Sequence, residues 1–117
     1  MNYLMTHTKH LENTIDVRAL NFFNNMQKQQ IVDIAKEVRG MIGENSKNQC
    51  DVASDLISNR LEIANIPHQI TSGWFNFEGH TWIEFGYGDV ILDITADQFG
   101  NYPKIWLPAD EFHYEIM

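Results

Sequence analysis

Basic residues are scarce in this sequence, and their scarcity excludes several classes of function. Only 8 Lys and Arg stand against 16 Asp and Glu, which gives a formal net charge of −8 over 117 residues. Such a chain repels phosphate backbones and anionic lipid unless it carries a local basic patch. The basic residues are scattered singly along the chain. We therefore expect neither a nucleic-acid partner nor a membrane partner.

Cysteine and long apolar runs are also nearly missing. The single cysteine, Cys50, cannot form an internal disulfide, which argues against a secreted disulfide scaffold. No apolar stretch approaches the ~18 residues that a membrane-spanning helix needs. The N-terminal residues MNYLMTHTKHLENTI show no signal peptide, because they lack an apolar run and a small-residue cleavage site. We expect a cytoplasmic protein.

The composition fits one globular domain. Hydrophobic residues make up 44% of the chain and aromatic residues 12%, which is typical of a protein with a packed core. A chain of 117 residues has the size of a single domain. We expect residues 1–117 to form that domain, with residues 1–20 as a loosely ordered extension. Asp16 is placed to cap a short helix over residues 17–25.

The first half of the chain has the apolar spacing of helices. Residues 29–43 carry one apolar stripe, and Gly43 supplies a stop; the stripe consists of Ile31, Ile34, Ala35, Val38, Met41 and Ile42. A second helix is expected to begin near Asn48 or Cys50. Its apolar positions follow Cys50 at steps of three or four, namely Ala53, Ile57, Leu61 and Ala64. Cys50 is therefore predicted at the N-terminal tip of a buried stripe.

The second half changes to β-branched and aromatic residues broken by glycine. It predicts strands at about 68–77, 80–86, 89–95 and 111–116, with Gly86, Gly88 and Asp89 in a turn between the second and third. Helices followed by strands favour an α+β fold, in which N-terminal helices pack on an antiparallel sheet.

Three residues have the chemistry to make a nucleophile of sulfur: Cys50 at a helix start, His80 in one strand and Asp93 in the next. The turn between these strands decides whether His80 and Asp93 meet. A two-residue turn pairs residue 85 with 88 and sets the two side chains directly opposite each other. A four-residue loop pairs 85 with 90 and sets them diagonally on the same face. A three-residue loop would place them on opposite faces.

The sequence offers further candidates around these three residues. The backbone N–H of Cys50 could stabilise an oxyanion, with a second donor from Asn48, Gln49 or Gln98. Glu84 shares a strand face with His80 and is a candidate hydrogen-bond partner around the site, while Asp97 is the runner-up for the acid. Trp74 and Trp82 could line a substrate groove, although packing in the sheet is the commoner role of such residues.

The stretch from Cys50 to Gly100 resembles the core of the transglutaminase-like branch of the papain-type thiol enzymes. The matching segments are CDVASDLISNRLEIANI, GHTWIEF and VILDITADQFG. The resemblance implies a papain-like, transglutaminase-like core with Cys50 as nucleophile, His80 as general base and acid, and Asp93 as the residue that orients it. It also implies acyl transfer from amides of a peptide or protein through a thioester, with proteolysis, deamidation, amide hydrolysis and cross-linking left open. It implies no cofactor.

Two other interpretations stay open at this point. Asp51 follows the cysteine where many members of that family carry an aromatic residue, and the chain is small. Both features favour a catalytically inactive protein-binding module with the same fold. A zinc site of Cys50, His80 and Asp93 is the third hypothesis, although the chain lacks HExxH and paired cysteines. His7 and His10 would need further ligands to hold a metal. We expect no metal.

Overall fold

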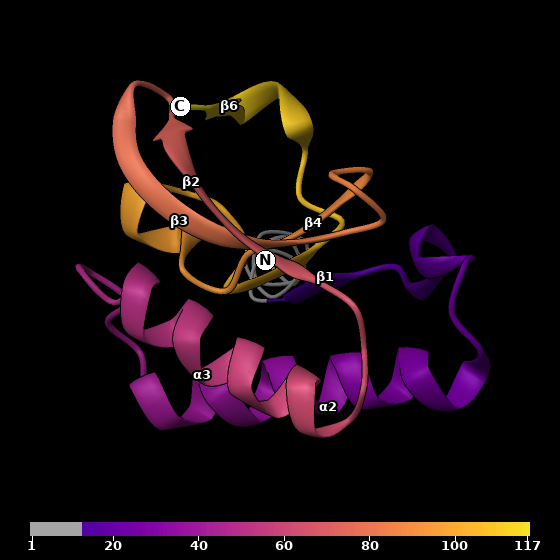
Figure 1. Ribbon diagram of the computed structural model, residues 1–117. Coiled ribbons are helices and arrows are strands. Elements are labelled where there is room, and N and C mark those ends of the chain that lie inside the picture. Colours follow the sequence, from indigo (N-terminus) through magenta and orange to yellow (C-terminus); the bar gives the residue numbers. More distant parts are fainter. Residues whose placement is uncertain (1–12) are drawn as a thin grey trace, which may run out of the picture.

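The computed structural model describes residues 13–117, which form an α+β fold of helices and an antiparallel, curled sheet (Figure 1). The helical elements are η1 (Val17–Leu20), α2 (Asn25–Ile42), α3 (Cys50–Ile63), η2 (Ala96–Phe99) and η3 (Glu111–His113). The strands are β1 (Asn13–Ile15), β2 (Gln69–Phe75), β3 (Glu78–Phe85), β4 (Val90–Leu92), β5 (Ile105–Leu107) and β6 (Tyr114–Ile116).

The sheet and the helices form two layers. Figure 1 shows α2 and α3 side by side on one side of the sheet, whose strand order is β4-β3-β2-β6. All neighbouring strands in this sheet are antiparallel. The core lies between the layers, where α3 packs on β3, and its fully buried residues include Ile31, Val38, Ile57, Leu61, Ile83 and Phe85.

Both long helices form in the predicted segments. In α2, the start of the helix and one residue of its buried face differ from the prediction. Gly43 ends α2 with a φ of 83°, as expected. The helix starts earlier than predicted, because Asn24 and Gln27 form a reciprocal capping box. Met41 is 56% exposed, so its place on the predicted stripe is wrong. The buried polar residue of this helix is Arg39.

The register of the β3–β4 hairpin matches one of the two registers that bring His80 and Asp93 together. Phe85 pairs with Val90, which leaves residues 86–89 as a four-residue turn. His80 and Asp93 then point to the same side of the sheet, and their side chains meet diagonally.

The structure corrects the predictions for the N-terminal part of the chain. Residues 13–20 form β1 and η1, and Leu20 is fully buried, so a loosely ordered extension over residues 1–20 is wrong for this part; the remainder lies outside the described residues. Asp16 caps η1 as predicted, but that helix ends at Leu20. β1 pairs in parallel with β5, a two-stranded sheet that the sequence pattern does not predict. Within residues 13–117, no helix is long and apolar enough to cross a membrane.

Candidate functional site

Cys50 is the first residue of α3, and this position favours a negative charge on its sulfur. The side chain of the N-cap residue Gln49 does not accept a hydrogen bond from the backbone amides of the first turn. Such amides and the helix macrodipole stabilise an anion at a helix start. The backbone N–H of Thr81 also lowers the pKa of Cys50. The Cys50 side chain is half-buried and carries a free thiol, so reagents can reach it.

His80 and Asp93 form a buried pair. Nε2 of His80 lies 2.7 Å from Oδ2 of Asp93, and both side chains are almost fully excluded from solvent. Because the carboxylate engages Nε2, Nδ1 is the ring nitrogen left for the Cys50 thiol. Nδ1 is buried and has no hydrogen bond of standard geometry within the described part of the chain. The thiol interacts with this ring through a contact that is looser than a standard hydrogen bond.

Three further bonds hold the Asp93 carboxylate in place. Tyr114 on β6 donates its hydroxyl to the same Oδ2 atom at 2.7 Å. The other oxygen, Oδ1, accepts from the backbone N–H of Thr95 at 2.9 Å and from its hydroxyl at 3.3 Å. Tyr114 is not among the residues that the sequence predicts for the site, because nothing in the local pattern of its strand shows that its hydroxyl reaches back to Asp93. Burial, followed by the neighbouring Asp93 charge, raises the Tyr114 pKa far above its usual range, so the phenol stays a donor.

The imidazole of His80 sits among aromatic rings. Its ring centre lies 4.9 Å from that of Phe99, 5.8 Å from Phe75 and 5.9 Å from Trp82. Burial among these rings lowers the pKa of His80, but the hydrogen bond to Asp93, the contact with Cys50 and the charges of both groups outweigh this effect. Together they raise the pKa from 6.5 to about 9. The ring therefore holds its proton at neutral pH.

The pKa of the Cys50 thiol is shifted downward, opposite to that of His80. The contact with the His80 ring lowers the pKa of Cys50, while burial opposes this effect. The charge of the imidazole and the Thr81 amide lower this pKa further, and the neighbouring Asp51 charge raises it. The net result is a lowered pKa, which favours a thiolate beside an imidazolium. Asp51 itself is exposed, where water screens its charge.

The structure separates the three candidates for a second oxyanion donor. The backbone N–H of Asn48 donates to Oε1 of Gln98 at 3.2 Å, and that of Gln49 donates to Ser46 O at 3.1 Å. Both backbone amides are therefore occupied, which leaves the side-chain amides of Asn48, Gln49 and Gln98 as candidates. The bond from Asn48 also fixes the orientation of the Gln98 amide, since Oε1 must be the atom that accepts. Nε2 of Gln98 is then buried without a hydrogen-bond partner within residues 13–117. A buried amide group without an acceptor costs about 1–3 kcal/mol, which makes Nε2 of Gln98 the candidate with an unmet hydrogen bond.

Arg39 joins the loop before Cys50 to the segment that carries Gln98. Its guanidinium makes a bidentate pair with Asp97 at 2.7 and 2.8 Å, and Ser46 donates to the same carboxylate at 2.6 Å. It also donates to the backbone oxygens of Ile94 and Glu44, among others. The loop before Cys50 is thereby tied to the segment after β4. Asp97 is not the acid partner of His80, because its carboxylate is engaged here.

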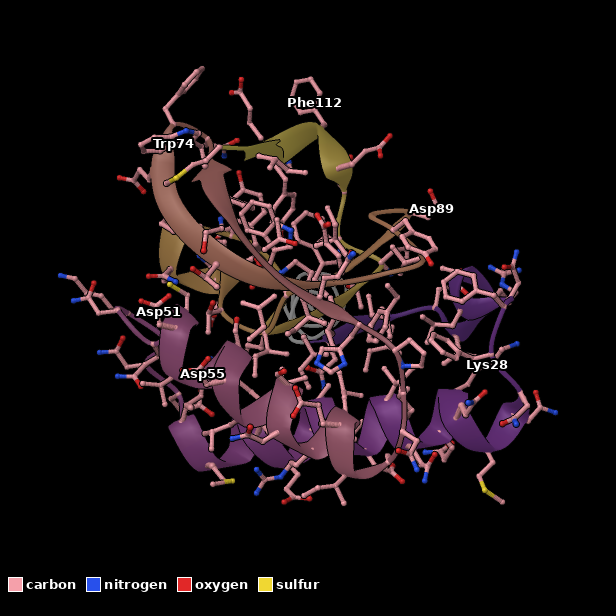
Figure 2. All side chains as sticks on the ribbon, viewed as in Figure 1. Lys28, Asp51, Asp55, Trp74, Asp89 and Phe112 are labelled. Carbon is pink, nitrogen blue, oxygen red and sulfur yellow. The ribbon has the colours of Figure 1, made fainter. Side chains whose placement is uncertain are left out.

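The remaining candidates have different environments. Trp82 is 1% exposed and packs in the sheet core, although it also borders a surface hollow, so its role as a groove residue stays a prediction. Its indole N–H donates to Glu84 at 2.9 Å, so Glu84 contacts the site through Trp82 and not through His80 itself. Trp74 is 41% exposed and borders a surface hollow. Figure 2 shows Trp74 on the outside of the sheet, at its end away from the helices.

No metal centre accompanies this arrangement in the described residues. Within residues 13–117, no group of three or more His, Cys, Asp or Glu side chains is placed to hold a metal ion. His7 and His10 lie outside the described residues. Comparisons of the chain with protein-family models, with curated proteins and with solved structures find no match in any of the three.

Proposed function

We propose that this protein is a thiol-dependent acyl-transfer enzyme that acts on amide bonds of a peptide or protein. The observation that carries this proposal is the buried pair of His80 and Asp93. Asp93 holds Nε2, which leaves Nδ1 as the ring nitrogen for a thiol whose pKa the imidazole lowers. A Cys-His-Asp arrangement on one helix start and two strands also supports the papain-like, transglutaminase-like core that the sequence resembles.

The chemistry follows from the protonation states of the two groups. The Cys50 thiolate attacks the amide carbon, and the carbonyl oxygen becomes an oxyanion. Donation from the Cys50 backbone N–H and from Nε2 of Gln98 stabilises that charge. The C–N bond then breaks, and His80 gives its proton to the leaving nitrogen. This leaves a thioester on Cys50 and a neutral imidazole.

The second half of the reaction restores the starting state. His80 takes a proton from water, and the hydroxide formed attacks the thioester carbon and releases a carboxylic acid and the thiolate. If the amide is a glutamine side chain, the first leaving group is ammonia and the reaction is deamidation. If an amine replaces water, the product is a cross-link. A reactive thiol persists in a reducing compartment, so we propose a cytoplasmic location.

Alkylation of Cys50 as a function of pH tests this proposal. The chain has one cysteine, so the intact mass after iodoacetamide treatment reports on Cys50 alone. We expect the wild type to react well below pH 8.5, the ordinary value of a thiol being about 8.5. The His80→Ala variant should shift the reaction toward pH 8.5. The His68→Ala variant is the matched control, because His68 contacts Ser58 and the Ile66 carbonyl instead of the thiol.

An alkylation profile of the native wild type that equals that of the unfolded chain would refute the enzyme proposal. It would leave the second candidate function, a protein-binding module with the same fold. Asp51, whose charge raises the pKa of Cys50, and the exposed aromatic residues of the sheet favour that candidate. Release of ammonia from a glutamine peptide, measured beside cleavage of its backbone, separates deamidation from proteolysis.

A further inference from the structure

Phe77 occupies a position that the stability of the fold does not explain. Phe75 pairs with Glu78, so Asn76 and Phe77 form the two-residue turn between β2 and β3. Their φ angles are 48° and 72°, and a turn of this kind favours Asn followed by Gly. A bulky residue at positive φ is strained. The Phe77 side chain is 91% exposed, so packing does not offset this strain.

Two more exposed aromatic residues lie beside this turn. Trp74 and Phe112 border the same hollow as Phe77, and its volume is about 330 Å³. Phe112 is 85% exposed. Figure 2 shows Trp74 and Phe112 on the outside of the molecule, at the end of the sheet away from the helices. Exposed aromatic residues gathered around a hollow mark an interaction site more often than scattered ones do.

The charge around this hollow has one sign. Residues 74–78 and 110–117 contain no Lys or Arg, and their acidic residues are Glu78, Asp110, Glu111 and Glu115. None of these four forms an ion pair with a residue in the part of the chain that the structure describes. Glu115 also borders the hollow, and it pairs with Trp74 across β2 and β6, so their side chains share one face. Aromatic faces beside a carboxylate attract a cation.

We propose that the surface of Trp74, Phe77, Phe112 and Glu115 binds a Lys or Arg side chain of the substrate peptide or protein. The charge of the surface argues for this occupant and against a second copy of the chain, because two copies would bring the same negative charge together. We name these four residues the cation surface. This inference rests on the proposed function, since it assigns a substrate class to the same enzyme.

The cation surface lies on the outer face of the strands whose inner face carries His80 and Tyr114, because side chains alternate along each strand. Tyr114 lines the hollow, and its hydroxyl donates to Asp93, the residue that engages His80. Trp74 pairs with Gly79, directly before His80 in β3. No atom lies within 4 Å of a side-chain carbon built on Gly79, so the sheet beside Trp74 is open. A basic side chain on the cation surface would therefore hold a substrate outside the candidate active site, through a segment other than the reacting amide.

Binding is best measured without turnover, in the full chain with Cys50→Ser. Three fluorescein-labelled nonapeptides with a central glutamine are the probes, and they differ only in flanking residues: arginine, serine or glutamate. We expect fluorescence anisotropy to show at least tenfold tighter binding of the arginine peptide than of the serine peptide. The preference should shrink in 0.5 M salt, because salt screens exposed charges.

Phe77→Gly provides the sharpest variant, because it removes the aromatic ring and the strain together. It should weaken binding of the arginine peptide about tenfold while the midpoint of thermal unfolding holds or rises. Tyr87→Gly is the matched control. Tyr87 is also 96% exposed at a positive φ of 59°, but it lies in the turn at the other end of β3. This control should leave peptide binding unchanged.

Each outcome decides between the occupants. Equal affinities for the three peptides, or unchanged binding by Phe77→Gly, overturn the cation surface. A wild-type dimer in sedimentation that Phe77→Gly converts to a monomer assigns the surface to a second copy and also overturns it. The alkylation of Cys50 is a separate readout. Normal thiol reactivity without a preference for arginine therefore refutes this inference alone, whereas an unreactive thiol with that preference refutes only the enzyme.

Discussion

Replacing Asp93 by Asn removes the charge beside His80 at nearly constant side-chain volume. Burial alone lowers the His80 pKa, and the bonds and charges of Asp93 and Cys50 raise it from 6.5 to about 9. This rise corresponds to about 3 kcal/mol, since one pKa unit is worth about 1.4 kcal/mol. Without the carboxylate, fewer interactions offset the lowering of the His80 pKa by burial. We expect the His80 pKa in Asp93→Asn to fall to 6.5 or below.

The sign of the linkage decides which assay can detect this change. The folded-state pKa of His80 lies above the unfolded value, so its contribution to stability is full below pH 6.5 and is lost as pH rises through about 9. The lowered pKa of Cys50 acts in the opposite sense, because it adds stability as pH rises toward the unfolded value of the thiol. The two effects partly cancel in the free energy of unfolding. The imidazole itself must therefore be observed.

The measurement is the NMR titration of the His80 ring, together with ultraviolet absorbance of the Cys50 thiolate. In the wild type, the ring should titrate near pH 9, and in Asp93→Asn it should titrate at 6.5 or below, with the thiolate forming at higher pH. Asp89→Asn is the control, because Asp89 is exposed in the β3–β4 turn and should leave both titrations unchanged. A wild-type ring that titrates near 6.5 would refute the reasoning, as would the same midpoint in Asp93→Asn.

Two further changes test the surroundings of the site. Asp97→Ala leaves the buried Arg39 guanidinium without its carboxylate and should lower the free energy of unfolding by about 3 kcal/mol. Urea titration checks this, and Glu37→Ala, which breaks a more exposed pair, should cost less than about 1 kcal/mol; equal losses would contradict the account. Gly73→Ala places a carbon 2.1 Å from the backbone oxygen of Glu115, so it should displace β6 and cost about 1–3 kcal/mol. Thermal unfolding with hydrogen exchange of residues 114–116 measures this, and unchanged protection there would refute it.

The helices and the hairpin could be predicted because their determinants are local. The apolar spacing of Ile31, Ala35 and Val38 fixes the buried face of α2, and Gly43 ends the helix. The turn of residues 86–89 contains two glycines at positive φ, and it sets the register that brings His80 to Asp93. Cys50 begins α3 within the range that the sequence indicated.

The features that the sequence did not reveal depend on distant contacts. Tyr114 bonds Asp93 only because β6 returns to pair with β2, and no local period encodes that pairing. The bond between Asn48 and Gln98 joins loops that are far apart in the chain, so the sequence left the oxyanion donor undecided. The buried position of Arg39 could have been predicted, because this residue interrupts the apolar stripe on the buried side of α2.

The route of the chain through Asp93 has a consequence for synthesis in the cell. The Asp93 carboxylate makes hydrogen bonds with β3, with the segment after β4 and with β6, so its final environment requires Tyr114 to be in place. A nascent chain that still lacks β6 has the sulfur and the imidazole but not their finished support. The buried pair of His80 and Asp93 therefore reaches its final geometry only when the segment that carries Tyr114 docks on β2.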